Sequence, residues 1–273
     1  SFISRGPMKV VHGFSNKKAF FNQSRLLYLL EKKSNVLIQE EIINFGAKES
    51  VFNMVSEFVC LENSSLDFYT KQNDLTNSSL INSFFCTQQK NSSSNFNVFS
   101  LNGKLIRNNV LVDLLGPQSN CSVLGGSLLK SSEHLDNFIT ISHLVKNCTS
   151  SQLFKSVYDG RSSGSFCGKI FVEKGAQKTE AFQQNKNLMI SKQASVNAKP
   201  QLEIFADDVV CSHGCTIGAI DTSALFYLRS RGVPKKEAIS LLIIAFLSEL
   251  ISNIKNKDIK NEIATLFLKP NNA

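Results

Sequence analysis

The sequence contains no tryptophan and only five prolines among its 273 residues. It has no uninterrupted run of about 18 apolar residues, the length that a membrane-spanning helix needs, and no secretory signal peptide opens it. Seven cysteines, an odd number at irregular spacing, argue against a disulfide framework. These absences favour a cytoplasmic protein with a packed core. Residues 1–7, which precede Met8, are interpreted as a leader or an added segment.

The formal net charge is +8, which raises the question of a polyanionic partner. Binding to nucleic acid usually needs basic residues gathered on one face or in one motif. Here the basic residues are spread along the chain, with small pairs at Lys17-Lys18, Lys32-Lys33 and Lys235-Lys236. The charge therefore indicates lysine-rich solvated surfaces and predicts no nucleic-acid partner.

Signatures of catalytic sites are also missing. The sequence has no Walker A motif, no G-x-G-x-x-G and no G-x-S-x-G. His12, His134 and His143 are isolated in sequence, and Glu133 and Asp136 beside His134 fit a polar strand end better than a catalytic group. His143 falls in an alternating run, which is typical of a half-buried, hydrogen-bonded histidine. We therefore predict that the chain is not an enzyme.

The first part of the chain suggests a short N-terminal segment over residues 1–35. Residues 8–34 look partly helical, because Ser24–Lys33 carries leucines at helical spacing. Its apolar positions are Leu26, Leu27, Leu29 and Leu30.

The long middle part, residues 36–218, is predicted to be a β-rich body. Short apolar runs alternate with Asn, Ser, Gly and Asp, as in Phe96-x-Val98 and Ile139-x-Ile141. Regular short strands without crossover helices leave a sandwich, a barrel or a β-solenoid open. The runs that we interpret as strands include Val36–Ile43, Val51–Leu61, Leu66–Tyr69, Phe96–Leu101, Leu105–Leu114, Phe138–Val145, Lys169–Val172 and Leu202–Phe205.

The last part, residues 219–273, is predicted to be a helical domain. Asp221 or Thr222 can cap a helix that ends near Arg231, and Gly232 follows where a C-terminal glycine belongs. A second, strongly apolar helix is predicted over 234–254, with Pro234 in its first turn, and a short third helix over 258–268. The second helix is too apolar for a lone surface helix, so it packs in the core or docks a partner.

Cys211, His213 and Cys215 form the pattern that most suggests chemistry. Residues at i, i+2 and i+4 of a strand project to one face, so two thiols and an imidazole would lie roughly 7 Å apart from one to the next. Such groups suit iron, zinc or iron–sulfur clusters, but a second chain would have to complete the site. Gly214 or Gly218 could bend the strand, and the alternative is that both cysteines are small buried residues. The remaining cysteines are predicted to be packing residues: Cys60, Cys86, Cys121, Cys148 and Cys167.

Several longer segments resemble the SufB/SufD family of the SUF iron–sulfur cluster assembly system, and within it the SufD type. The match lies in Lys199–Val209, Cys211–Gly214 and Ala224–Gly232, and it extends over Val36–Leu268. The resemblance implies a right-handed parallel β-helix with a C-terminal α-helical domain, which selects the solenoid among the alternatives above. Upstream segments that agree are Glu62–Leu66, Gly103–Asn109, Tyr158–Gly164 and Ala176–Ala181.

The same resemblance implies a non-catalytic scaffold subunit. Its expected partners are SufB, through the end of the β-helix, and the ATPase SufC, through the C-terminal helices. It assigns His213 as an interface ligand of iron or of a transient iron–sulfur cluster, with Cys211 as the neighbouring thiol, and no cofactor permanently bound. The chain departs from the family in its short N-terminal region, in Cys215 where alanine is common, and in Phe138 where a polar residue or histidine is expected.

Two other functions remain open at this point. A stand-alone metalloprotein would use Cys211, His213 and Cys215 by itself and would bind metal stoichiometrically. A β-solenoid enzyme acting on carbohydrate would need paired carboxylates in an open groove. The sequence offers no convincing pair of that kind.

Overall fold

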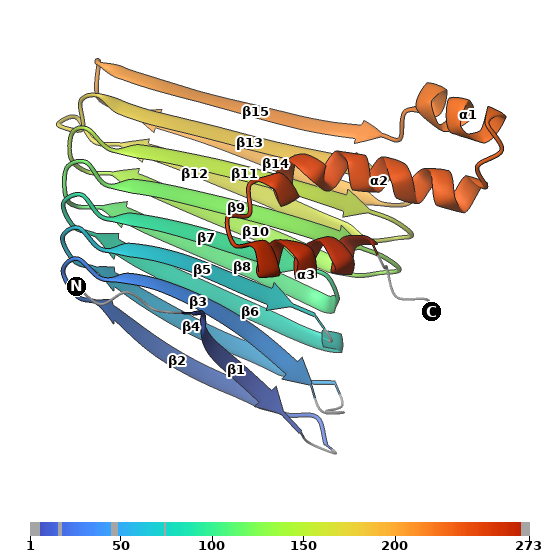
Figure 1. The fold of residues 1–273 in the computed structure, drawn as a ribbon, viewed down its shortest axis with the longest axis horizontal. Coiled ribbons are helices and arrows are strands. Elements are labelled where there is room, and N and C mark those ends of the chain that lie inside the picture. Colours follow the sequence, from blue (N-terminus) through green and yellow to red (C-terminus); the bar gives the residue numbers. More distant parts are fainter. Residues whose placement is uncertain (1–5, 16–17, 45–48, 74, 269–273) are drawn as a thin grey trace.

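The protein is an all-parallel β-solenoid that carries three helices after its last strand (Figure 1). The structure is a computed structural model and describes residues 6–15, 18–44, 49–73 and 75–268. Within these residues the strands make about seven turns. Residues 1–5 of the proposed leader and Lys17 lie outside the described residues.

Successive strands alternate between two sheets. Among the described residues, the odd sheet contains, in spatial order, β1 (Met8–Phe14), β3 (Asn35–Asn44), β5 (Ser65–Gln72), β7 (Ser93–Ser100), β9 (Asn120–Leu129), β11 (Thr149–Tyr158), β13 (Thr179–Met189) and β15 (Val209–Ala219). The even sheet runs through β2 (Phe21–Leu30), β4 (Val51–Cys60), β6 (Leu75–Gln88), β8 (Gly103–Leu114), β10 (His134–His143), β12 (Ser163–Val172) and β14 (Ser195–Ile204). Each strand pairs with the strand two places along the chain, so one turn stacks directly on the next.

The corners before β3, β5, β7, β9, β11 and β13 each contain a residue with positive φ. A residue with positive φ stands there in turn after turn, such as Asn63 (59°), Asn91 (55°) and Asn147 (60°). Asparagine tolerates this left-handed region better than most residues. The backbone N–H of the corner residue donates to the corner of the next turn, as from Asn63 to the Lys90 carbonyl oxygen at 3.0 Å. The recurrent Asn and Ser between apolar runs are therefore the corners of the solenoid.

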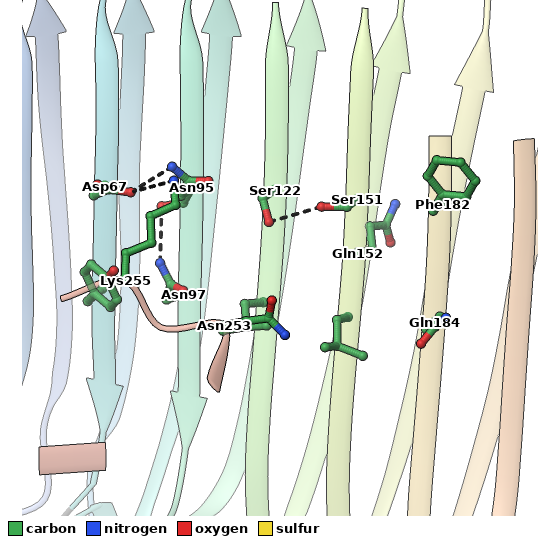
Figure 2. Close-up of a pocket in the computed structure, with 13 residues that line it drawn as sticks. Asp67, Asn95, Asn97, Ser122, Ser151, Gln152, Phe182, Gln184, Asn253 and Lys255 are labelled. Atoms are coloured by element: carbon green, nitrogen blue, oxygen red, sulfur yellow. Dashed lines mark hydrogen bonds and ion pairs between the residues drawn. The ribbon is translucent and has the colours of Figure 1, made fainter. Parts of the chain in front are cut away.

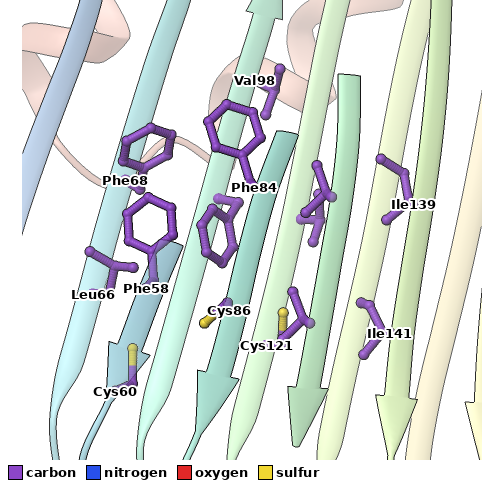
Figure 3. Packing of buried hydrophobic residues seen from close by; sticks show 14 of the residues in the cluster. Phe58, Cys60, Leu66, Phe68, Phe84, Cys86, Val98, Cys121, Ile139 and Ile141 are labelled. Carbon is purple, nitrogen blue, oxygen red and sulfur yellow. The ribbon is translucent and has the colours of Figure 1, made fainter. Parts of the chain in front are cut away.

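The interior between the two sheets is filled by alternating inward side chains, many of them aromatic (Figure 3). The ring of Phe68 lies 5.0 Å from that of Phe58 and 5.3 Å from that of Phe84, with interplanar angles of 67° and 62°. Edge-to-face contacts of this kind add to the hydrophobic stabilisation. The predicted packing role is confirmed for the four solitary cysteines that are buried, which are Cys60, Cys86, Cys121 and Cys148. The fifth, Cys167, is half-buried.

The C-terminal segment forms the three predicted helices: α1 (Thr222–Ser230), α2 (Lys235–Ser252) and α3 (Lys257–Leu268). Asp221 caps α1 by accepting from the amides of residues 223 and 224, as the sequence predicts. Gly232 follows α1 with a φ of +87°, which a residue with a side chain would adopt only with strain. Pro234 is the N-cap of α2 rather than a residue of its first turn.

Helices α2 and α3 lie on the outer face of the odd sheet (Figure 1). Lys155 of β11 reaches Glu249 of α2 at 2.6 Å, and Lys71 of β5 reaches Glu262 of α3 at 2.6 Å. Apolar side chains of α2 and α3 also pack against the sheet in a second core, which includes Phe99, Leu128, Val157, Leu247, Leu250 and Ile263. Core packing therefore accounts for much of the apolar character of α2. In the part of the chain that the structure describes, no helix has the length and hydropathy needed to cross a bilayer.

The predicted β-solenoid with C-terminal helices is confirmed, but the predicted helix over Ser24–Lys33 is wrong. Most of that segment lies in β2, which pairs in parallel with β4. Leu26, Tyr28 and Leu30 point inward, whereas Leu27 and Leu29 are 66% and 57% exposed. Leucines on both faces of a strand have the same sequence spacing as an apolar helix face. Parallel pairing with β4 makes this segment a strand.

Candidate metal half-site at the open end of the solenoid

The candidate site lies on the last turn of the solenoid. Strands β14 and β15 are the edges of the two sheets, and each pairs with one neighbour only within the described residues. Figure 1 shows both at the same end of the stack, next to the start of α1. The inward side chains of β15 are therefore covered from one side by β13 and remain accessible from the other.

The predicted ligands Cys211 and His213 share the inward face of β15 with Cys215. Cys211, His213 and Cys215 stand opposite Ala181, Gln183 and Asn185 of β13, whose side chains are all buried. The Cys211 side chain packs against a buried apolar cluster, and Cys215 Sγ donates to Asn185 Oδ1 at 3.6 Å. Cys211 is half-buried, whereas His213 and Cys215 are exposed. The prediction of a common face is confirmed.

The glycines of β15 do not disturb this arrangement. The register between β13 and β15 continues without a shift through Gly214 and Gly218 to Ala219. A Cβ at either glycine would meet no atom within 4 Å. The alternative in which a bent strand takes Cys211, His213 and Cys215 off their common face is therefore wrong.

The two thiols differ little in their electrostatic environment. Burial raises the pKa of Cys211 above its ordinary value, while a backbone hydrogen bond at Ala181 partly opposes this. Burial likewise raises the pKa of Cys215. A thiol with a raised pKa is protonated near neutral pH, so a metal ion must displace the proton when it binds.

The donor set fits iron, but it is incomplete. Thiolate and imidazole are suitable ligands for iron and for iron–sulfur clusters. Across residues 6–15, 18–44, 49–73 and 75–268, no three His, Cys, Asp or Glu side chains gather in a way that could hold a metal ion. Alternate positions of one strand are too far apart to surround a single ion. Cys211 and His213 therefore lie together at the open end without enough neighbouring donors in the described residues to enclose an ion.

The other histidines have structural surroundings. His143 is fully buried, its Nε2 lies 2.8 Å from Ser150 Oγ, and burial lowers its pKa to about 4. His134 contacts Ser163 and Asp136 at the surface end of β10, which confirms the predicted polar strand end.

His12, isolated in sequence, has an acidic neighbour in the fold. Its Nε2 lies 3.4 Å from the carboxylate of Glu40, which is buried on the adjacent strand β3. The two residues are 28 positions apart in sequence, so only the stacking of turns brings them together.

A polar floor beneath the half-site was missed at the level of sequence. Gln183, Asn185 and Asn187 point inward from β13 and are buried. The Gln183 position is apolar in β5, β7 and β9, whereas the Asn187 position is polar in every odd strand from β5 to β13. Asn187 Nδ2 donates to Asn185 Oδ1 at 2.6 Å and to the Thr216 carbonyl oxygen at 3.2 Å. The alternation Gln-x-Asn-x-Asn in a β-rich region was the available signal.

A separate cavity of about 310 Å³ lies on the outer face of the odd sheet, beside the link between α2 and α3. Figure 2 shows its polar side chains side by side on neighbouring strands, in rows that cross the sheet. Several already bond one another: Asn95 donates to Asp67 at 2.7 Å, and Ser151 donates to Ser122 at 3.2 Å. None of the predicted ligands lines it. We therefore place the candidate site at the open end.

Comparison with known proteins defines the family. Residues 13–246 match the model of the SUF system FeS cluster assembly, SufBD core domain, so the chain belongs to this family. Its similarity to proteins named SufD makes it a SufD-type subunit.

Three relatives illustrate the extent of the match. The iron-sulfur cluster assembly protein SufD of Escherichia coli is 37% identical over 165 residues, which cover 60% of this chain and 39% of that protein. The SufBD family protein slr0076 of Synechocystis is 33% identical, and the match covers 85% of this chain and 53% of that protein. SufD of Bacillus subtilis is 30% identical, and the match covers 93% of this chain and 58% of that protein. The chain spans about half the length of the curated relatives it matches.

Proposed function

We propose that this protein is a non-catalytic, cytoplasmic scaffold subunit that presents half of an iron-binding site to a SufB-type partner during iron–sulfur cluster assembly. The observation that carries the proposal is the position of Cys211 and His213 on the uncovered inner face of the last turn. Iron, or a nascent cluster, is the cargo of this site, and the partner supplies the missing ligands.

The strand edges around the half-site support pairing with a second β-solenoid. An edge strand carries a row of backbone amides and carbonyls that another strand can use. Apolar side chains surround these edges: Ile204 is 37% exposed, Ile217 52% and Val210 58%. An exposed apolar group of this kind is typical of an interaction surface. A partner that extends the two sheets would place its own residues directly over His213.

The helices support contact with a SufC-type ATPase. Helix α1 has no buried residue, although it carries Phe226 and Tyr227, which are 74% and 59% exposed. Leu241 of α2 is 43% exposed nearby in sequence. Because α2 and α3 are anchored on the odd sheet, a force applied at α1 would reach the sheet that bears the half-site.

Co-purification tests the proposed partners. The protein is expected to form a stable complex with SufB-type and SufC-type chains, and Val210→Glu is expected to abolish SufB binding without lowering thermal stability. Phe226→Ala is expected to weaken SufC binding alone. A complex that tolerates both substitutions would contradict the proposed surfaces.

A further inference from the structure

Two buried polar side chains, one on β11 and one on β13, stand in line with His213. Gln152 of β11, Gln183 of β13 and His213 of β15 occupy the same register position in three neighbouring strands. Neighbouring strands lie about 4.8 Å apart, so their side chains stack within contact distance. Gln152 and Gln183 are only 2% and 1% exposed. Two buried carboxamides in this position call for hydrogen-bond partners.

The carboxamide of Gln183 has one partner and one unused atom. Its Nε2 donates to Gln152 Oε1 at 2.9 Å. Its Oε1 has no hydrogen-bond partner among the residues that the structure describes. Leaving a buried oxygen unpaired costs about 1–3 kcal/mol, so a donor in the complete assembly is expected.

The opposite sheet fixes where this carboxamide lies. A Cβ at Gly168 of β12 would come within 1.8 Å of Gln183 Nε2. The absence of a side chain at Gly168 therefore makes room for the amide group. With Nε2 bound to Gln152 and set against Gly168, the side chain has little freedom to turn.

His213 is the next residue in that line, and its ring carries an N–H, the kind of donor that Gln183 Oε1 lacks. On its two sides, Cys211 packs against an apolar cluster and Cys215 bonds to Asn185, so neither thiol is assigned to Gln183. We propose that Gln183 is a positioning residue for His213, whose ring N–H donates to the buried Oε1 atom. This bond fixes one imidazole tautomer and leaves the second ring nitrogen unprotonated and directed toward iron. The inference rests on the proposed function, in which His213 binds iron.

Nitrogen-15 NMR of the histidine rings tests the bond directly. The chain has four histidines, and His213→Gln identifies the signal of interest. In the wild-type complex with the SufB-type partner, which covers the exposed face of His213, the ring is expected to be held in a single tautomer with an N–H that exchanges slowly with water. In the complex of Gln183→Met, which keeps the side-chain length, the tautomers are expected to mix and the slow exchange to disappear. A freely exchanging His213 ring in the wild-type complex would overturn the proposal without any variant.

Gln152→Met is the matched control. Both variants break the bond between Gln183 and Gln152, but only Gln183→Met removes the oxygen beside His213. Cobalt(II) titration of the complex with the SufB-type partner is expected to show binding weakened about 10- to 100-fold in Gln183→Met and nearly unchanged in Gln152→Met. Equal effects of the two variants on tautomer and affinity would show a merely structural role.

The outcome is distinguishable from a failure of the proposed function. If His213→Ala leaves cluster assembly intact while Gln183→Met still changes the tautomer, His213 is positioned but is not the ligand. If His213→Ala abolishes assembly and Gln183→Met changes neither tautomer nor affinity, the ligand role stands and the positioning role is refuted.

Discussion

Glu249 joins the helical cap to the solenoid, and Glu249→Ala is expected to loosen that cap. The Lys155 side chain is 6% exposed and has two partners on α2, Glu249 at 2.6 Å and the Phe246 carbonyl oxygen at 2.7 Å. Its ammonium group also lies 5.0 Å from the centre of the Phe246 ring. Removal of Glu249 leaves a buried charge with one neutral acceptor and one aromatic face.

The magnitude follows from the unequal exposure of the two partners. Breaking a fully buried ion pair costs about 3–5 kcal/mol, because the remaining charge is uncompensated. Glu249 is 45% exposed, so water can approach and we expect about 2 kcal/mol. Lys155→Met removes the charge itself and should cost about 1 kcal/mol or less. Lys186 is 32% exposed and bonds Glu249 at 3.0 Å, so the control Lys186→Met should cost about 0.5 kcal/mol.

Hydrogen exchange along the chain measures this effect where it occurs. In Glu249→Ala, the amides of α2 are expected to exchange roughly 30-fold faster, which corresponds to the 2 kcal/mol above, while those of β4–β10 remain unchanged. The double variant Lys155→Met with Glu249→Ala should recover most of the loss. If Glu249→Ala costs no more than Lys155→Met, the reasoning from a buried, uncompensated lysine is refuted.

Two further predictions concern the core and the pH dependence. Phe68→Ala, at a residue with 0% exposure, should lower the free energy of unfolding in urea by about 3–5 kcal/mol. The control Phe205→Ala, at a residue that is 59% exposed, should lower it by less than about 0.5 kcal/mol. Similar losses in the two variants would refute the packing account. Hydrogen bonds from Lys155 and Lys186 hold the pKa of Glu249 below its ordinary value of 4.5. The stability of wild type over Glu249→Ala should therefore be complete above pH 4.5 and decline as the pH falls through the lowered pKa, as followed by circular dichroism; a constant difference down to pH 3 would contradict it.

Sequence patterns predicted the elements more reliably than their assembly. Alternating apolar residues identified many strands of the body, although none of the runs named above falls in β6, β9, β11 or β13. Asp221 and Gly232 marked the ends of α1 by local chemistry alone. The choice of a solenoid over a sandwich or barrel came from the family resemblance, because neighbouring turns share a backbone conformation rather than a side-chain sequence. The strand β2 was missed because its stabilising partner, β4, lies a full turn away.

The candidate site was predicted in part for the same reason. The spacing of Cys211, His213 and Cys215 sufficed to place them on one face, since strand geometry is local. Gln183 is 30 positions before His213 and becomes its neighbour only through the register of β13 and β15. The pairing of His12 with Glu40 was missed for the same physical reason. Residues that act together across turns are set by the rise of the solenoid, which sequence spacing alone does not reveal.

Anaerobic reconstitution of the complex with SufB-type and SufC-type partners tests the central claim most directly. His213→Ala is expected to leave the complex intact by gel filtration but to abolish the visible absorption of the assembled cluster. Cys215→Ala, at another exposed position of the same face, is expected to retain cluster assembly. Normal cluster formation by an intact His213→Ala complex would contradict the assignment of the half-site.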